Sequence, residues 1–402
     1  MKLVFLTQYF PPEIGAPQAR LFELARGLKN KGHDVTIVTA FPNYPGGKIL
    51  FGYKLRPFME EEIEGLKVLR TWIYPSHSKS FTKRLFNYFS FVFSSMLFGI
   101  FKLGKHDVLI CETPPLFLGL SAYVLSRLKG AKMFLYVSDL WPASAVDLGM
   151  LKNKMLIRWS ERLERFLYYK SEKVVVVTPG MKKIIEKDPV LNGKVFVVTN
   201  GADTAFFKPS AKEPARQALG LPQDKFIVMY SGNHGIAQNL RTVLLCAKKT
   251  ADNRNILYAF AGDGVEKPLL IAEKEKSGLD NVVFLKSYPK KEMPVVLASA
   301  DAAIIPLKNI KLFEKALPSK MFEIMSMGIP VIMGVKGEAA EIIMEAGAGI
   351  NIIPEDENSM EKAVLELYNS KELRERLSKN GREYVNSHFS RETIINRFEG
   401  LL

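Results

Sequence analysis

Hydrophobic residues of this chain gather in short unbroken blocks, separated by longer segments with helical spacing. The short blocks are rich in Val, Ile, Leu and Phe and do not alternate with polar residues, which is typical of parallel strands covered on both faces. In the first half this pattern predicts strands near 2–8, 33–40, 66–74, 107–113, 132–138, 173–178 and 194–199. Helices are predicted between them, near 17–31, 83–103, 116–129, 151–170 and 180–187. The alternation predicts a doubly wound α/β sheet.

The same pattern starts again after the turn-rich stretch Asn200-Gly201-Ala202-Asp203, which we interpret as a linker. Strands are expected near 226–231, 256–261, 282–286, 302–306, 330–334 and 350–353. Helices are expected near 239–250, 266–277, 291–299, 319–327, 338–346 and 358–368. A chain of 402 residues is also too long for one hydrophobic core. We therefore expect two Rossmann-like domains, at 1–200 and 204–385, facing each other across a deep cleft in which ligands bind at the carboxyl ends of strands.

The segment 316–332 reads as a loop, a short helix, a glycine stop and an apolar strand. Pro318 suits the first turn of a helix, and the unpaired amides of that turn attract anions. Lys320 adds a full positive charge there, and Glu323 follows about one turn later, where it could accept hydrogen bonds from sugar hydroxyls. An ordinary helix start followed by a surface Glu explains this stretch equally well when it is taken alone.

Polar and glycine residues follow several other predicted strands. Gly15 lies in the loop after the first strand, where a missing side chain lets backbone approach a ligand. Asp139 follows a later strand and could be a base, a hydroxyl acceptor or a helix N-cap. In the second half, glycine-rich strand ends resemble anion cradles; they hold Gly232, Asn233, Gly235, Gly262 and Gly264. His234, in the same region, could be a ligand-binding group, but a lone histidine is more often a structural hydrogen-bonding residue.

Three kinds of site are not expected. The loop after the first strand lacks the GxGxxG fingerprint, so a nicotinamide cofactor is not predicted. Two separated cysteines and five scattered histidines give no metal site and no disulfide framework, which fits a reducing compartment. No nucleic-acid-binding module is recognisable.

The net charge of +14 is carried almost entirely by the first half of the chain. Residues 1–200 hold 29 Lys and Arg against 16 Asp and Glu, a net charge of +13, whereas residues 201–402 hold 27 against 26, a net charge of +1. The predicted helix at 83–103 has no charged residue from Leu85 to Phe101 and has basic residues at both ends. It could span a membrane, lie in its headgroup region or pack in the core; a span would cut the sheet, and the basic ends favour the headgroup region of an anionic membrane.

Taken together, these motifs resemble the retaining, nucleotide-sugar-dependent glycosyltransferases of family 4, which have the GT-B fold. Within that family the chain is similar to the bacterial and archaeal surface-polysaccharide branch, which includes colanic-acid and N-acetylfucosamine transferases. The resemblance covers essentially the whole chain and rests on Gln8–Arg20, Asp139–Pro142, Thr199–Asp203, Gly232–Gln238, Gly262–Gly264, Leu317–Lys320 with Glu323, and Gly337–Glu341.

The resemblance implies a role for each matching position. The donor would be a nucleoside-diphosphate sugar, usually a uridine one. Glu323 would hold the ribose, Leu317, Pro318, Ser319 and Lys320 would face the diphosphate and donor sugar, and Gly15 would lie near the same phosphates. Tyr288 would lie near the base, and the last helix, about 386–402, would return to the first domain. Asp139, Gly15 and Lys320 are the expected catalytic residues.

Three positions depart from the family pattern. Lys315 stands where the first Glu of the Glu-x7-Glu motif is usual, and Ser138 where many members carry a cleft histidine. Gln238 stands where many members place the lysine that contacts the diphosphate, so Lys320 is expected to supply that charge.

The implied reaction is transfer of a sugar with retained configuration, without a metal or other cofactor. The expected donor is UDP linked to an N-acetylated or deoxy hexosamine. The expected acceptor is a lipid-linked or other saccharide of surface polysaccharide synthesis, handled by the first domain. We expect a cytoplasmic protein bound peripherally to the inner face of the cell membrane. The alternatives are a sugar-nucleotide epimerase of the same fold and a non-catalytic nucleotide-binding scaffold; a phosphorylase would need a much longer chain and a pyridoxal-phosphate lysine.

Overall fold

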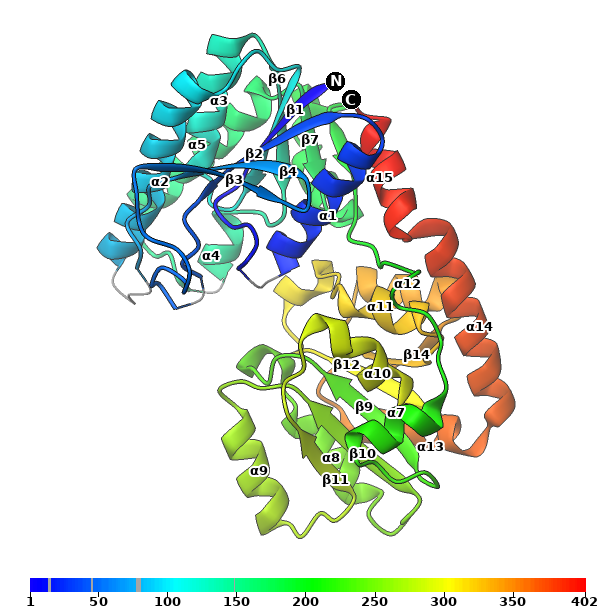
Figure 1. Cartoon of the computed structure of the whole chain (residues 1–402). Coiled ribbons are helices and arrows are strands. Elements are labelled where there is room, and N and C mark those ends of the chain that lie inside the picture. Colours follow the sequence, from blue (N-terminus) through cyan, green and yellow to red (C-terminus); the bar gives the residue numbers. More distant parts are fainter. Residues whose placement is uncertain (14–15, 45, 77–80, 148) are drawn as a thin grey trace. The chain divides into compact units, whose positions relative to one another are not determined.

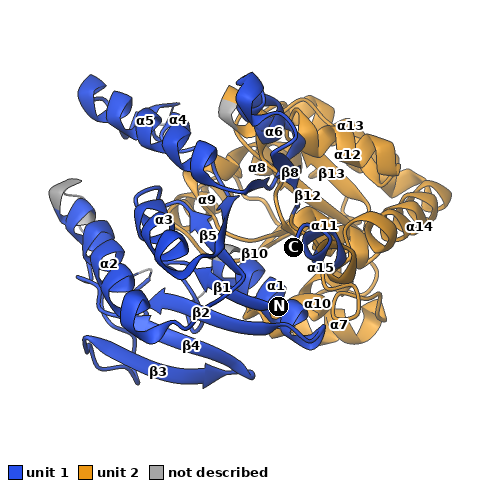
Figure 2. Cartoon of the chain, turned by 90° about the horizontal axis from the view of Figure 1, so that it is seen from above, with its two compact units in different colours: residues 1–199, 395–402 blue, residues 200–394 orange. Residues whose placement is uncertain are grey.

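The chain folds into two compact units. A computed structural model describes residues 1–13, 16–44, 46–76, 81–147 and 149–402. Unit 1 comprises residues 1–199 and 395–402, and unit 2 comprises residues 200–394 (Figures 1 and 2). The sequence had suggested domains at 1–200 and 204–385 with a returning helix at about 386–402, so the largest difference lies near the carboxyl terminus.

Unit 1 is built on an eight-stranded sheet in the order β3-β4-β2-β1-β5-β6-β7-β8. All neighbouring strands are parallel except the edge pair β3 and β4. Phe5 in the central strand β1 lies opposite Ile37 of β2 and Ile110 of β5. The strands are β1 (Lys2–Leu6), β2 (Asp34–Ala40), β3 (Phe58–Ile63), β4 (Leu66–Thr71), β5 (Val108–Thr113), β6 (Lys132–Val137), β7 (Lys173–Val176) and β8 (Val195–Val197).

Helices cover both faces of this sheet. Helices α2, α3 and α5 lie on one face, and α1 lies on the other with the last helix, α15 (Figure 1). The helices of unit 1 are α1 (Ala16–Asn30), α2 (Phe81–Lys102), α3 (Leu118–Lys129), α4 (Ala143–Asp147), α5 (Lys154–Lys170) and α6 (Pro179–Ile185), with a 3-10 turn at Pro189–Leu191.

The sequence pattern missed strand β3. Its sequence, Phe-Met-Glu-Glu-Glu-Ile, carries three consecutive acidic residues, and it pairs on one side only, antiparallel to β4. An edge strand needs no continuous apolar run, and charges there discourage pairing with other chains. The apolar-block criterion therefore fails at this edge.

Unit 2 contains a parallel six-stranded sheet in the order β11-β10-β9-β12-β13-β14. Successive side chains of each strand enter different cores: Ile227 and Met229 of β9 pack on one face, and Val228 and Tyr230 pack on the other. The strands are β9 (Phe226–Ser231), β10 (Ile256–Ala261), β11 (Val282–Leu285), β12 (Ala302–Pro306), β13 (Val331–Gly334) and β14 (Gly349–Asn351).

The helices of unit 2 include two that the sequence pattern did not predict, α7 and most of α14. Both are highly charged; in α14 the buried residues are Leu377, Gly381 and Val385. The helices are α7 (Lys212–Leu219), α8 (Arg241–Lys249), α9 (Lys267–Lys276), α10 (Met293–Ala298), α11 (Lys320–Ser326), α12 (Glu338–Ala346), α13 (Glu357–Asn369) and α14 (Lys371–His388). Helix α15 (Arg391–Glu399) begins in unit 2 and ends in unit 1. Short 3-10 turns lie at η2 (Ile236–Gln238), Lys290–Glu292 and η4 (Lys311–Lys315).

The carboxyl-terminal segment is divided between the units. The predicted single helix at 386–402 is wrong: α14 ends at His388, and α15 begins at Arg391. Between them the chain pairs with the linker, because the amide of Ala202 donates to Phe389 O at 2.9 Å and the amide of Arg391 donates to Ala202 O at 2.8 Å. The end of α15 belongs to unit 1, where Ile395 lies so close to Gly27 that a side chain at residue 27 would meet it at 2.1 Å.

Candidate functional site

The carboxyl edge of the unit 2 sheet is lined by glycine turns. Its strand order reverses between β9 and β12, and ligands of such sheets bind at the carboxyl ends of strands near this point. Directly after β9, Gly232 has a φ of +136°, and directly after β10, Gly262 has a φ of +143°. A Cβ on Gly262 would lie 1.9 Å from the carbonyl oxygen of Gly232, so only glycine allows the two turns to approach this closely.

One hydrogen bond joins these two turns, and a second closes the turn that follows β9. The amide of His234 donates to Asp263 O at 2.8 Å, and the amide of Gly235 donates to the side-chain oxygen of Gln238 at 3.2 Å. A Cβ on Gly264 would meet the Asn233 side-chain oxygen at 2.7 Å and the His234 carbonyl oxygen at 2.5 Å. The predicted cluster of glycines, Asn233 and Gln238 is therefore brought together in space, and Gln238 caps its own turn.

Lys320, at the start of helix α11, extends its side chain to the carboxyl end of β9. Its Nζ donates to Ser231 O at 2.9 Å and lies 4.4 Å from the centre of the Tyr230 ring. A Cβ on Gly232 would lie 2.8 Å from the same ammonium. Burial lowers the pKa of Lys320 to about 8, and Glu323 acts in the opposite direction. One cation thus lies at the end of β9, beside the glycine turn, with reduced hydration.

The helix start at this site is shifted from the predicted one. Helix α11 begins at Lys320 with Ser319 as its N-cap, so Pro318 precedes the first turn rather than occupying it. The carbonyl of Pro318 accepts a hydrogen bond from the amide of Met321 at 2.9 Å. Leu317 packs on the hydrophobic core, and Glu323 lies half-buried in the first turn.

Two further residues of the unit 2 edge are Tyr288 and His234. Tyr288 is half-buried, with Lys286 Nζ 5.2 Å from the centre of its ring, and burial raises its pKa. His234 is fully buried, and within the described part of the chain neither ring nitrogen has a hydrogen-bond partner, so the predicted structural hydrogen bond from its ring is wrong. Burial lowers the pKa of His234 to about 4, which keeps its imidazole neutral near pH 7.

The carboxyl edge of the unit 1 sheet carries a buried ion pair that sequence reasoning did not identify. Glu112 of β5 accepts from Arg20 Nη2 at 2.8 Å, from Ser138 Oγ at 3.0 Å and from Thr7 Oγ1 at 2.8 Å. The Arg20 guanidinium also lies 5.3 Å from the centre of the Tyr136 ring. One signal was present in the sequence, since Glu112 is the only charged residue of the apolar strand Val108–Thr113.

The structure gives a different result for each unit 1 residue that the sequence singled out. Asp139 is exposed just after β6, and its carboxylate accepts from Ser144 Oγ at 2.7 Å. Because helix α4 begins at Ala143, Asp139 is not its N-cap, and that alternative is wrong. Ser138, which stands where a cleft histidine is usual in the family, belongs to the Glu112 cluster. Gly15 lies outside the described residues.

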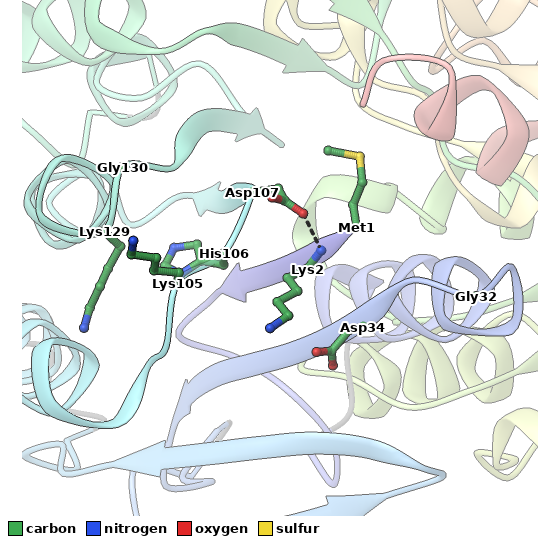
Figure 3. A pocket seen from close by; sticks show the side chains of 9 residues that line it. All are labelled: Met1, Lys2, Gly32, Asp34, Lys105, His106, Asp107, Lys129 and Gly130. Carbon is green, nitrogen blue, oxygen red and sulfur yellow. Dashed lines mark hydrogen bonds between the residues drawn. The ribbon is translucent and has the colours of Figure 1, made fainter.

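A separate depression lies at the opposite, amino edge of the unit 1 sheet (Figure 3). It measures about 670 Å³ and is lined by the starts of β1 and β2 and by the residues before β5, including Lys2, Asp34 and Asp107. The backbone amide of Lys2 donates to Asp107 Oδ2 across it at 2.7 Å. None of the predicted site residues lines this depression. Among the described residues, no group of three or more His, Cys, Asp or Glu side chains is arranged to hold a metal ion.

Solved structures of known proteins share this architecture over the full chain. Sucrose-phosphate synthase of Thermosynechococcus elongatus superimposes with a TM-score of 0.78 at 18% identity and covers 100% of this chain and 98% of its own. HepE of Anabaena, in complex with UDP and glucose, gives 0.74 at 15% identity and covers 100% and 99%. At these identities the likeness establishes the fold alone.

Sequence comparison adds the family. WcaI of Escherichia coli K12, a glycosyl transferase named for colanic acid biosynthesis, is 27% identical over 337 residues, which are 82% of this chain and 82% of WcaI. The family "Glycosyl transferase 4-like domain" matches residues 15–201, and the family "Glycosyl transferases group 1" matches residues 211–384. With these two domains in succession on two Rossmann-like units, the chain belongs to the glycosyltransferases of the GT-B fold.

Proposed function

We propose that this glycosyltransferase moves a sugar, with retained configuration, from a nucleoside-diphosphate donor to an acceptor of surface polysaccharide synthesis. The observation that carries the proposal is the carboxyl edge of unit 2, where Lys320 Nζ lies beside the Gly232 turn and Lys267 Nζ donates to Gly262 O at 2.8 Å. Backbone that a ligand can approach closely and a partly dehydrated cation such as Lys320 suit a diphosphate.

The proposed chemistry follows from the leaving group. As the bond between the anomeric carbon and the diphosphate oxygen breaks, negative charge grows on the diphosphate. Lys320 and the backbone of the turns would stabilise that charge, and such preorganised groups are usually the largest contribution to catalysis. The acceptor oxygen then bonds to the anomeric carbon from the same face, and its proton passes to a diphosphate oxygen. No metal is required in this scheme, so turnover in the presence of a chelator should equal turnover without it.

The relatives support a particular kind of donor and pathway. HepE is described in complex with UDP and glucose, WcaI is named for colanic acid biosynthesis, and the structural neighbour WaaG is involved in lipopolysaccharide biosynthesis. These names support UDP as the nucleotide of the proposed donor. We propose in addition an N-acetylated or deoxy hexosamine as the sugar and a lipid-linked saccharide as the acceptor, as the family resemblance implies. Glu323 would contact the ribose and Tyr288 the base.

Unit 1 is the proposed acceptor unit, with Asp139 as its reactive carboxylate. Asp139 is exposed, and Ser144 Oγ orients its carboxylate from one side. A carboxylate in this position would accept a hydrogen bond from a hydroxyl of the acceptor or of the donor sugar other than the attacking one, whose proton passes to the diphosphate. Asp139→Asn should then lower kcat about a hundredfold while UDP affinity, measured by calorimetry, stays unchanged. Full turnover by this variant would remove the role.

We also propose that unit 1 binds the inner face of the cell membrane from the cytoplasm. Helix α2 is long and apolar enough to cross a membrane, and a third of Leu85–Lys102 is buried. Its other face exposes an apolar stripe, in which Phe86, Phe93 and Phe101 are 70%, 62% and 74% exposed. Trp159 of α5 is 59% exposed beside Arg162, whose guanidinium lies 5.8 Å from the centre of the indole ring. Exposed aromatics in a strongly basic half of the chain suit an interfacial contact with anionic lipid.

Vesicle flotation tests the membrane contact independently of the donor. Vesicles of phosphatidylglycerol and phosphatidylcholine should carry the protein upward at low salt. Phe86→Ser combined with Phe93→Ser should weaken this binding at least about tenfold, because each buried Phe contributes roughly 1.5–3 kcal/mol. Leu269→Ser, at a 65% exposed position of α9 in unit 2, is the matched control and should float normally. Absence of binding to anionic vesicles would contradict the contact.

A panel of nucleoside-diphosphate sugars tests the catalytic proposal. The expected donor should raise the melting temperature and support transfer to a lipid-linked saccharide extracted from membranes. Interconversion of the free donor sugar without an acceptor would indicate an epimerase instead. Donor binding without transfer or interconversion would indicate a scaffold.

A further inference from the structure

Tyr230, near the end of β9, contacts both components of the proposed diphosphate site. Its side chain is 1% exposed, and its hydroxyl donates to Asn233 O at 2.5 Å. The face of its ring lies 4.4 Å from Lys320 Nζ. We propose that Tyr230 is a positioning residue, which holds the Gly232–Gly235 turn through its hydroxyl and the Lys320 ammonium through its ring. This inference rests on the proposed function, because it concerns the same donor site.

The hydroxyl contact acts on the turn. The chain leaves β9 at Ser231 and bends at Gly232, whose φ is +136°, so that Asn233 O lies at the phenol oxygen. A Cβ on Gly232 would lie only 3.5 Å from that oxygen, which shows how closely the turn covers it. Without the hydroxyl, the Asn233 carbonyl loses this buried donor and the turn loses its attachment to the sheet.

The ring contact acts on the lysine. Lys320 Nζ donates to Ser231 O at 2.9 Å, while the tyrosine ring lies beneath it. A carbonyl oxygen fixes the ammonium along one direction, and an aromatic face attracts it along another. Together the two contacts define the place from which the ammonium meets a phosphate. A leucine at residue 230 would leave only the carbonyl contact.

A second buried tyrosine in the neighbouring strand shows what an ordinary core tyrosine does here. Tyr258 of β10 packs in the same hydrophobic cluster as Tyr230. Its hydroxyl lies 3.3 Å from Cys246 Sγ and 3.0 Å from Thr250 Oγ1, both at helix α8 and neither among the site residues. Tyr258→Phe therefore removes a comparable buried hydroxyl at a distance from the site.

The experiment is a double-mutant cycle with UDP and uridine as calorimetric probes, on the full chain. Uridine lacks the diphosphate, so the ratio of the two dissociation constants isolates the phosphate-binding part of the site. Tyr230→Phe should weaken UDP binding about fivefold through the turn. Tyr230→Leu should weaken it about twentyfold, since both contacts are lost. Uridine affinity should stay within about twofold in both variants, as should the UDP-to-uridine ratio in Tyr258→Phe.

The same substitutions in the Lys320→Ala background show whether the Tyr230 ring affects phosphate binding through Lys320. In the Lys320→Ala background, Tyr230→Leu should cost only about the fivefold that Tyr230→Phe costs, because the ring has no ammonium to hold. Equal costs of Tyr230→Leu in both backgrounds, or a parallel loss of uridine affinity, would overturn the inference. If Tyr230→Leu fails to fold, the fivefold and phosphate-specific effect of Tyr230→Phe still decides the hydroxyl contact.

The proposed function can fail separately in the same measurements. If the unmodified chain binds UDP no better than uridine, the donor site itself is wrong, and the inference about Tyr230 is lost with it. If Lys320→Ala abolishes the preference for UDP but no Tyr230 variant changes it, only the role of Tyr230 is wrong.

Discussion

The carboxyl edges of the two sheets are built differently, although both sheets reverse strand order at the same topological point. In unit 2 the reversal between β9 and β12 is lined by backbone, with glycines at 232, 262 and 264; the ammonium groups of Lys320 and Lys267 donate to Ser231 O and Gly262 O there. In unit 1 the reversal between β1 and β5 is filled by side chains, among which Glu112 binds Arg20, Ser138 and Thr7.

The two edges therefore differ in how their positive charges are balanced. At the unit 2 edge the Lys320 ammonium contacts a carbonyl and an aromatic ring, and the charge of Glu323 also acts on it. At the unit 1 edge the charge of Arg20 is balanced by Glu112, whose side chain is 2% exposed. A Rossmann sheet thus determines where a ligand binds, while the residues after each strand determine what kind of ligand it is.

The largest expected effect tests the ion pair between Arg20 and Glu112 in unit 1. Glu112→Ala removes the carboxylate that faces Arg20 inside unit 1, and breaking a buried ion pair costs about 3–5 kcal/mol. Thermal unfolding should therefore show a clear fall in the melting temperature of unit 1.

Thr7→Val measures how much a single hydroxyl of the same cluster contributes to stability. It removes only one hydroxyl from the Glu112 cluster and should cost about 1 kcal/mol. Equal effects of the two substitutions would mean that the ion pair contributes nothing beyond a hydrogen bond.

A smaller effect on UDP binding, accompanied by a loss of stability from the positive φ, is expected at the Gly232 and Gly262 turns of unit 2. Gly262→Ala introduces a Cβ that would lie 1.9 Å from Gly232 O, at a φ of +143°. The two turns must separate, and UDP affinity should fall about a hundredfold, which corresponds to about 2.7 kcal/mol. Calorimetry with UDP measures this directly.

Gly278→Ala is the matched control for that substitution. Gly278 also has a positive φ, +61°, but a Cβ there would meet nothing within 4 Å. Its substitution should lower stability by about 1–2 kcal/mol and leave UDP affinity unchanged. Equal loss of UDP affinity in both variants would contradict the role of close approach at residue 262.

The smallest effect is a pH dependence that only the unit 2 edge should show. Burial lowers the pKa of Lys320 to about 8 from an ordinary 10.5. A bound diphosphate favours the charged ammonium, so UDP affinity should be constant below pH 8 and fall up to about tenfold per pH unit above it. The free protein behaves oppositely: between pH 8 and 10.5 the unfolded chain binds a proton that the folded chain does not, so this group makes stability rise with pH.

Lys320→Arg should remove the alkaline fall, because a guanidinium stays charged over this range. A fall that persists in Lys320→Arg would assign the titration to another group.

The sequence anticipated the central elements of both sheets better than their margins. Buried parallel strands such as β9 and β10 are continuous apolar blocks, and their predicted bounds match those of the structure. Strand β3 and helices α7 and α14 carry many charges because each has solvent on one side. Their formation depends on the neighbours they pack against, and an apolar-block criterion does not register those neighbours.

Only some of the candidate site residues could be predicted, because a local sequence pattern does not register contacts between distant residues. Gly232, Gly262 and Gly264 could be found because strand ends and glycines are local features of the sequence. The cluster of Arg20, Glu112 and Ser138 joins residues up to 118 positions apart and could not be found that way. Asp139 illustrates the intermediate case: its position after a strand was readable, but the choice between cap and free carboxylate needed the start of α4.

The sequence alone determined that this chain forms two Rossmann-like units with glycine turns at strand ends, because apolar blocks and glycine turns are encoded over a few residues. The tertiary structure alone decided which residues meet at those ends. Ser231 and Lys320 are 89 positions apart, and the ammonium reaches the carbonyl because β12 and the loop before α11 lie beside β9 in the sheet. Contacts of this kind depend on strand order and packing, and no local pattern of the sequence specifies either.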